Sequence, residues 1–421
     1  MKDYLIGFCR IIVGSLFIFS GLIKANDPLG FSYKLEEYWI EFGMNWDWLI
    51  SIGPTMASII CILEIVLGIA ILIAFRVKLV SRLLLFIMVF FTILTFASAV
   101  FGLVKTCGCF GDAFPLTPWQ SFIKDIVLIV LVLVINSYSA DIKPYKERYK
   151  GTAFVIFPTV IMAFISNYLD WNFPLYFTMG LLIFYFLGAF VNPEYSGKLT
   201  VALSLIGSVW VCYYSLNHLP MKDFRPYAIG KSIVEQMHLP EGAKPDVYKN
   251  VFKYKNKNTG EVESFDDSNY PWDDENYEFV DRITSLVEKG DEAKITDFSI
   301  VDSDGSDITE DILNDQNPIL VVISSNTEKA CKSNALKLSE LIKSCNQEGV
   351  SVIGLSASNP ASVKKYTDEN DLEMSFYATD EITLKTIVRS NPGLILLRDG
   401  VVEGKWHIND VPVFAELLVK D

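Results

Sequence analysis

The sequence predicts a polytopic α-helical membrane domain followed by a water-soluble α/β domain. The chain has 421 residues, of which 51% are hydrophobic, and its first half contains repeated apolar runs. Residues 1–217 hold 14 basic and 13 acidic side chains, whereas residues 218–421 hold 22 and 37, so the acidity belongs to the second half. From about residue 295 onward, strand patterns alternate with helix patterns, which indicates a small α/β domain.

Seven apolar runs each approach the twenty or so residues that a helix needs to cross the hydrocarbon core. They lie at 4–23, 50–74, 79–103, 117–137, 151–169, 174–191 and 199–217. Residues 24–49, after the first run, are rich in Tyr and Trp, which favours a segment at the membrane–water interface. We predict seven transmembrane helices, four within residues 1–140 and three within residues 141–217.

Basic loop residues predict the orientation of these helices. Arg76, Lys78 and Arg82 follow the second span and more basic residues at 143–150 follow the fourth, and such loops face the cytoplasm. The N-terminus is then cytoplasmic, and residues 218–421 are extracytoplasmic. Membrane lipid is the expected environment of the first half, and the acidic second half argues against nucleic acid as a partner because phosphates would be repelled.

Cys107 and Cys109 are the candidate catalytic residues. They flank Gly108 in the predicted outer loop at 104–116, on the side of the membrane where disulfides persist. A bridge across one glycine closes a very small ring, and the strain this implies favours a labile, exchanging disulfide. The sequence therefore predicts thiol–disulfide exchange at this loop.

Two other interpretations of the cysteines stay open. The pair could be inert, as small apolar fillers are; Cys9, Cys61 and Cys212, inside apolar runs, are interpreted in that way. A metal site is the weakest interpretation, because two thiols one residue apart with distant histidines do not match zinc spacing. We expect no metal.

Ionisable side chains inside the predicted bundle are the second group of candidates. Glu64 lies in the middle of the second span, Lys124 and Asp125 lie in the fourth, and Lys24 ends the first. Such residues are costly in lipid and mark functional sites by default. We expect them to handle protons or a quinone, with Lys124 and Asp125 pairing across the bundle with Glu64 or Lys24; a purely structural packing pair is the alternative.

The soluble half divides into two parts. Residues 218–294 are predicted to form a juxtamembrane tether and a hairpin that turns at 258–260, followed by a loop and a short helix at 272–289. Residues 295–421 predict strands at 319–324, 351–356 and 375–378, a helix at 327–345 and a final antiparallel hairpin.

The order of these last elements resembles the thioredoxin-like fold, with Pro392 where that family carries its cis-proline. The Cys-x-x-Cys of catalytic thioredoxins is missing, because only Cys331 is near, placed about one turn into the predicted helix. Cys345 would lie too far along that helix to bridge it. We therefore expect a degenerate domain that binds a protein partner through the region of Pro392 and Cys331.

Residues 1–140 have a more specific resemblance. The segments at 20–28 and 63–70, and above all Cys-Gly-Cys-Phe-Gly-Asp at 107–112, resemble the DoxX family and its MauE branch. These are four-helix bacterial membrane proteins, related in architecture to vitamin K epoxide reductase and tied to thiol and disulfide chemistry. Fused to a thioredoxin-like domain, the whole resembles DoxX-family proteins of the Bacteroides group, which implies the bacterial inner membrane with a periplasmic C-terminal domain.

Together these features predict a membrane thiol–disulfide relay component, in which Cys107 and Cys109 exchange with an extracytoplasmic protein and a quinone takes or supplies electrons. Whether the protein is an enzyme stays open. The alternative is a membrane scaffold or assembly factor whose degenerate thioredoxin-like domain captures an envelope protein. A transporter is less favoured because no inverted repeat of broken helices is visible.

Overall fold

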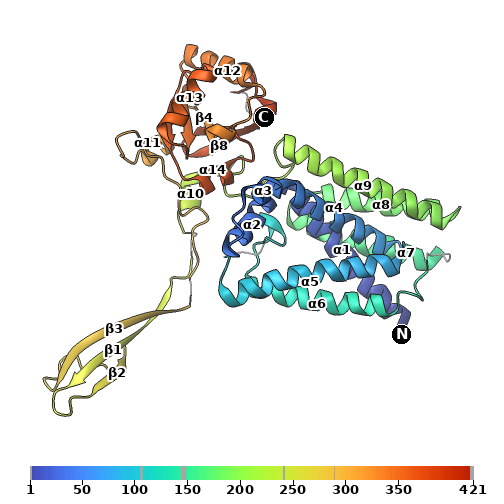
Figure 1. The fold of residues 1–421 in the computed structure, drawn as a ribbon, viewed down its shortest axis with the longest axis horizontal. Coiled ribbons are helices and arrows are strands. Elements are labelled where there is room, and N and C mark those ends of the chain that lie inside the picture. The colour runs from blue at the N-terminus through green and yellow to red at the C-terminus, as the bar shows by residue number, and fades with distance from the viewer. Residues whose placement is uncertain (1, 105–107, 144–147, 240–241, 289, 418–421) are drawn as a thin grey trace.

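The computed structural model describes residues 2–104, 108–143, 148–239, 242–288 and 290–417. A bundle of long helices, a compact α/β domain and a slender β arm make up the molecule (Figure 1). The N-terminus lies at the end of the bundle away from the α/β domain, so the α/β domain covers the opposite end (Figure 1).

Five helices are long and apolar enough to cross a membrane, and two shorter apolar helices accompany them. The long helices are α1 (Lys2–Asn26), α4 (Gly53–Leu72), α5 (Val77–Phe101), α6 (Pro118–Ser137) and α9 (Pro193–Asn217). The shorter apolar stretches belong to α7 (Arg148–Tyr168) and α8 (Phe173–Ala189). All seven fall on the predicted apolar runs, so the chain is a membrane protein with a polytopic helical domain.

Helices α1 and α4 approach each other closely at Gly14 and Gly68. A Cβ atom on Gly68 would lie 2.8 Å from the carbonyl oxygen of Gly14, which leaves no room for a larger residue. Small residues allow this approach between membrane helices. Nearby, the buried Arg10 side chain donates to the carbonyls of Ile71 and Leu72, so the last turn of α4 has hydrogen-bond partners.

The predicted interfacial segment forms two short helices, α2 (Pro28–Glu41) and α3 (Asp47–Ser51). Asp27 caps α2 because its carboxylate accepts a hydrogen bond of 2.8 Å from the Gly30 amide, and Pro28 opens the helix. The cap fixes Asp27 at the end of the bundle that the α/β domain covers.

The β arm consists of three antiparallel strands in the order β2-β1-β3. The strands are β1 (Val247–Asn256), β2 (Val262–Asp266) and β3 (Tyr277–Glu288). The predicted hairpin is confirmed, but the short helix expected at 272–289 is wrong. Residues there pair with β1 over its whole length, and this long-range pairing overrides the local pattern.

The C-terminal domain is built on a five-stranded mixed sheet in the order β6-β5-β4-β7-β8. Its strands are β4 (Ile319–Ser324), β5 (Ser351–Ser356), β6 (Ser375–Ala378), β7 (Gly393–Arg398) and β8 (Val401–His407). The helices of this domain are α11 (Thr309–Leu313), α12 (Ala335–Gln347), α13 (Pro360–Asn370), α14 (Glu381–Ile387) and α15 (Phe414–Leu417). Strand β4 runs parallel to β5 and antiparallel to β7, as a thioredoxin-like sheet requires, and the Asn391–Pro392 bond before β7 is cis.

Buried charges anchor the tether between the two bodies. The Asp223 carboxylate accepts hydrogen bonds from Arg225 and, at 2.8 Å, from Lys405 of β8, and both cations are buried. Burial alone would raise the pKa of Asp223, but Arg225 and Lys405 outweigh it and lower the pKa. The tether is thus fastened to the sheet just where it leaves the membrane helices; it continues into the short α10 (Ile233–Met237).

Replacing Asp223 by asparagine is expected to destabilise the protein by about 3 kcal/mol at pH 7, because two buried cations lose their carboxylate. Since the folded-state pKa of Asp223 lies below its ordinary value, this stability is present above about pH 4 and is lost as the pH falls through the folded-state pKa. Thermal unfolding of both proteins between pH 7 and pH 3 measures the effect. Asp170→Asn is the matched control, because Asp170 pairs with Lys222 while 94% exposed and should cost under about 1 kcal/mol. Equal losses in the two variants would contradict the prediction.

Candidate functional site

The Cys109 thiol lies in the loop between α5 and α6, at the end of the bundle under the C-terminal domain. Gly108 adopts φ of 66°, a left-handed conformation that favours glycine at this position of the loop. Ser20 donates to the carbonyl oxygen of Cys109 at 3.1 Å, which fastens the loop to α1. Cys109 is a free thiol, whereas Cys107 and Lys105 lie outside the described residues, and the predicted disulfide stays a prediction.

A cavity of about 30 Å³ brings Cys109 together with the predicted ionisable residues. It is lined by Cys109, Lys24, Glu64, Lys124 and Asp125. Three helices therefore bring ionisable side chains to one thiol, because Lys24 comes from α1, Glu64 from α4, and Lys124 and Asp125 from α6. The sequence predicts that the four ionisable side chains are costly in lipid, and the fold places all four around one cavity.

The pairing of these charges differs from the prediction. Lys24 and Glu64 form the ion pair across the bundle at 2.5 Å, with both side chains almost fully buried. Lys124 instead pairs at 2.5 Å with its neighbour Asp125, whose other carboxylate oxygen accepts from Thr95. The expected cross-bundle partners of Lys124 and Asp125 were wrong because adjacent side chains on one helix reach each other first. Within the described residues, Glu64 Oε2 accepts no hydrogen bond.

Burial and the neighbouring charges determine the pKa of the Cys109 thiol. Burial raises the pKa of Cys109, Lys124 and Lys24 lower it, and Asp125 raises it again. The thiol is therefore mostly protonated at neutral pH, and Lys124 is the cation that favours the reactive thiolate most.

Replacing Lys124 by methionine is expected to slow alkylation of reduced Cys109 about tenfold at pH 8, equivalent to one unit of pKa. The rate is measured by mass spectrometry of the Cys109 peptide after timed exposure to a maleimide. Lys198→Met is the matched control, because Lys198 lies on α9 and pairs with Glu194 in an exposed position. An unchanged rate in Lys124→Met would show that its charge does not act on the thiol.

The cavity does not fit the expected quinone. Ligand pockets for drug-sized molecules measure roughly 300–1,000 Å³, whereas the cavity beside Cys109 has room for about one water molecule. The small cavity that Cys109 lines thus offers no space for a quinone ring.

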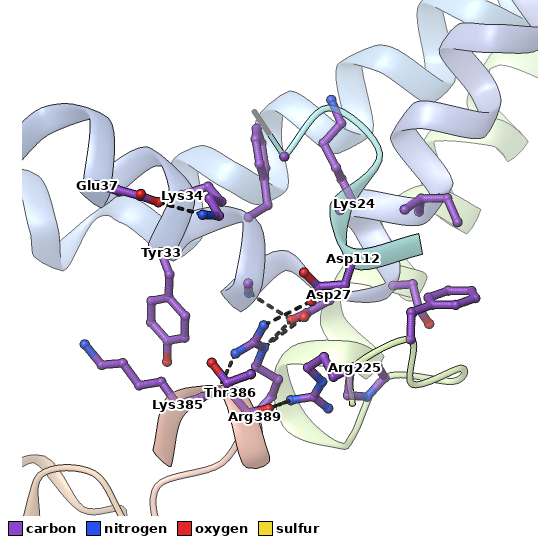
Figure 2. A pocket seen from close by; sticks show the side chains of 18 of the residues that line it. Lys24, Asp27, Tyr33, Lys34, Glu37, Asp112, Arg225, Lys385, Thr386 and Arg389 are labelled. Atoms are coloured by element: carbon purple, nitrogen blue, oxygen red, sulfur yellow. Dashed lines mark hydrogen bonds and ion pairs between the residues drawn. The ribbon is translucent and has the colours of Figure 1, made fainter. Parts of the chain in front are cut away.

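A second, larger cavity of about 490 Å³ lies between the membrane domain and the C-terminal domain. Lys24 and Gly108 line it on the membrane side, and Lys385 and Arg389, in and just after α14, line it on the other side. Figure 2 shows Arg389, just after α14, pointing toward Asp27 and Asp112. Gly108 and Asp112 line the cavity, so a solute or peptide in it would contact the cysteine loop.

Arg389 joins the two domains across this cavity. Its guanidinium, 6% exposed, donates from Nε to both oxygens of Asp27 at 3.0 and 2.8 Å, and lies 3.7 Å from the Asp112 carboxylate (Figure 2). Burial raises the pKa of Asp112, and Arg389 opposes this. Sequence reasoning missed this contact because its partners are 362 residues apart; the one available signal is the position of Arg389 three residues before the cis-proline.

Cys331 lies at the membrane-facing edge of the C-terminal domain. The prediction that it lies within a helix is wrong: Thr327–Lys329 forms a 3₁₀ turn and α12 begins only at Ala335. Asn334 adopts φ of 61°, so the chain cannot enter the helix earlier. Cys331 is exposed in the preceding loop, and its amide donates to the carbonyl of Asn391 at 2.7 Å, beside Pro392.

A chain of polar contacts connects this loop to the membrane domain. Ser333, whose hydroxyl lies 2.8 Å from the Cys331 sulfur, also contacts Asn409, and Asn409 donates to the carbonyl of Asn217 at the end of α9. The two residues predicted to bind a partner, Pro392 and Cys331, therefore lie in adjacent segments, which these contacts connect to the end of α9.

Comparison with known proteins agrees with this division of the chain. Residues 2–137 match the family described as methylamine utilisation protein MauE, residues 248–289 match a domain of unknown function (DUF8463), and residues 290–384 match the AhpC/TSA family. The protein TlpB of Flavobacterium psychrophilum is 28% identical over 173 residues, which are 40% of this chain and 45% of TlpB. The chain thus spans less than half the length of this relative, and no solved structure matches it.

The family matches explain the two bodies of the fold. The MauE match covers α1 to α6 with the cysteine loop, and the AhpC/TSA match covers the first three strands of the five-stranded sheet with the Cys331 loop. This chain joins an N-terminal membrane domain of the MauE, DoxX-like type to a C-terminal thioredoxin-like domain of the AhpC/TSA type, and it is a distant homologue of TlpB.

Proposed function

We propose that this protein is a membrane thiol–disulfide exchange component in which Cys107 and Cys109 form the exchanging pair. The observation that carries the proposal is the position of the Cys109 thiol, in a cavity with two buried ion pairs and beside the docked thioredoxin-like domain. A MauE-type domain next to an AhpC/TSA-type domain supports thiol-based redox chemistry.

The exchange conserves atoms and electrons between this protein and its partner, so it needs no further reactant. A thiolate of the protein partner attacks the Cys107–Cys109 disulfide, a mixed disulfide forms and one cysteine leaves as a thiolate. The partner's second thiolate then displaces the remaining cysteine, so the partner becomes a disulfide and Cys107 and Cys109 become thiols. Lys124 stabilises the Cys109 thiolate as it leaves, and Glu64 Oε2, unpartnered within the described residues, is placed to take up or return a proton.

The orientation that best suits this chemistry is the one predicted from the loops. The seven apolar helices cross the inner membrane of a bacterium, the N-terminus is cytoplasmic, and the cysteine loop and the thioredoxin-like domain lie in the periplasm. The partner is an extracytoplasmic protein that approaches the edge carrying Cys331 and Pro392, which faces the membrane domain. Cys331 is a single thiol, so the domain presents or receives the partner and is not a dithiol enzyme by itself.

Thiol trapping in native membranes tests the proposal. The redox state of the Cys107–Cys109 peptide is measured with and without prior reduction, and a disulfide-linked fraction is expected. In the Cys109→Ser variant, Cys107 has no resolving partner, so a covalent adduct with the partner protein should accumulate on non-reducing gels and vanish with reductant. Cys9→Ser, which removes a buried thiol of α1, should give no adduct. Two permanently reduced cysteines without an adduct would exclude the exchange.

The β arm favours a second candidate function, a membrane scaffold that captures an envelope protein. Strand β3 is an edge strand with largely exposed apolar side chains, among them Phe279 and Val287, and Figure 1 shows the arm projecting away from both other bodies. Unpaired strand edges are templates for strand addition by another chain.

The Cys107→Ser/Cys109→Ser variant and a deletion of 247–288 distinguish the two functions in cells. Full activity of the serine variant with loss of activity in the deletion would favour the scaffold. Loss of activity in the serine variant, at unchanged protein level, would favour the exchange.

A further inference from the structure

Two cysteines interpreted from sequence as separate apolar fillers are neighbours in the fold. Cys61 of α4 and Cys212 of α9 belong to one buried core cluster, and their exposures are 0% and 3%. The Cys61 thiol has the Cys212 thiol as a side-chain hydrogen-bond partner. Independently, the Cys212 sulfur lies 4.0 Å from the carbonyl oxygen of Ser58, one turn before Cys61 on α4. The two sulfurs thus face each other where α4 packs on α9.

The surroundings of this pair contain the buried charges already described. Glu64 follows Cys61 by three residues and so lies on the same face of α4. The charges of Lys24 and Glu64 both act on Cys61, and the charge of Lys24 also acts on Cys109. One ion pair therefore lies near both thiol sites, and its carboxylate oxygen Glu64 Oε2, unpartnered within the described residues, is placed to hold a proton released by either.

We infer that Cys61 and Cys212 are a second redox site, a dithiol that closes reversibly to a disulfide linking α4 to α9. The oxidant is a disulfide: Cys61 thiolate attacks it, a mixed disulfide forms and one thiolate leaves. Cys212 thiolate then attacks the Cys61 sulfur and releases the second. The pair loses two electrons as its disulfide forms, and the two released thiolates carry these electrons away and take up the two protons.

The source of oxidant within the chain is the Cys107–Cys109 disulfide, and this part of the inference rests on the proposed function. Because the MauE match ends at residue 137, the bond would join the MauE-type bundle to a helix outside it. Helix α9 leads directly into the tether, so the bond would also fix the root of the thioredoxin-like domain.

A split-chain assay tests the pair. A protease site is inserted after residue 143 of the full chain, so that cleavage leaves Cys61 and Cys212 on different fragments. Membranes are treated with diamide, a permeant reagent that oxidises two thiols to a disulfide, then cleaved and run without reductant. We expect the fragments to stay joined, to separate with reductant, and to separate without it in Cys61→Ala and Cys212→Ala. Cys9→Ala, which alters a different buried core cluster, should leave them joined.

The Cys107→Ser/Cys109→Ser background separates this inference from the proposed function. Diamide should still join the two fragments in this background. That result would support the Cys61–Cys212 pair even if the proposed Cys107–Cys109 exchange fails. In untreated cells the joined fraction should fall in that background, and an unchanged fraction would overturn the internal oxidant. Fragments that separate after diamide, or that stay joined in Cys212→Ala, would overturn the pair itself.

Discussion

Replacing Lys24 by methionine is expected to destabilise the membrane domain by about 3–5 kcal/mol. Lys24 and Glu64 are both 3% exposed and pair at 2.5 Å, so the substitution leaves a carboxylate buried without its cation. Thermal unfolding of the protein in lipid nanodiscs measures the loss. Hydrogen–deuterium exchange of the backbone amides around the cavity that holds Cys109 should also become faster, because Lys24 lines that cavity.

Two further variants make the Lys24 prediction specific. Lys198→Met removes the cation of an exposed i,i+4 pair with Glu194 on α9, and is expected to cost under about 1 kcal/mol. The double variant Lys24→Met/Glu64→Leu removes both charges and should recover most of the stability, since apolar replacements of buried pairs are often tolerated. If Lys24→Met unfolds no earlier than Lys198→Met, the buried pair does not stabilise the bundle.

Replacing Arg389 by methionine is expected to release the thioredoxin-like domain from the membrane domain. The buried guanidinium holds Asp27 and approaches Asp112, and losing one partner of a buried charge pair costs about 2–5 kcal/mol. A cost of about 3 kcal/mol would lower the docking equilibrium roughly a hundredfold. Hydrogen–deuterium exchange of α2 and α14, which face each other across the larger cavity, reports the release as faster exchange in both helices.

Arg398→Met is the matched control for docking. Arg398 ends β7 and pairs with Glu403 at 3.2 Å inside the same domain, so its loss should leave α2 exchange unchanged. A second expectation follows from the position of Asp112 in the cysteine loop: release of the domain should raise the rate of Cys109 alkylation. Identical exchange in Arg389→Met and Arg398→Met would show that the Arg389 contact does not hold the domains together.

The membrane helices and the strands of the sheet could be predicted because their signals are local. An apolar run of about twenty residues lowers its free energy in lipid whatever it packs against, and alternating strands and helices follow from short-range patterns. The candidate residues Glu64, Lys124 and Cys109 were found for the same reason, since a charge in an apolar run or a Cys-Gly-Cys is visible without a structure. Local pattern was misleading at Cys331, where Asn334 delays the helix, and at β3, where pairing with β1 decides the conformation.

By itself, then, the sequence determined that this is a helical membrane protein with a thioredoxin-like appendage and a cysteine loop between apolar runs. Only the tertiary structure decided that Lys24 pairs with Glu64, that Arg389 reaches Asp27, and that Cys61 meets Cys212. The physical reason is that burial and helix formation depend on residues a few positions apart, whereas these contacts join side chains 40 to 362 residues apart. Their partners are chosen by helix packing and domain docking, which no short window of sequence contains.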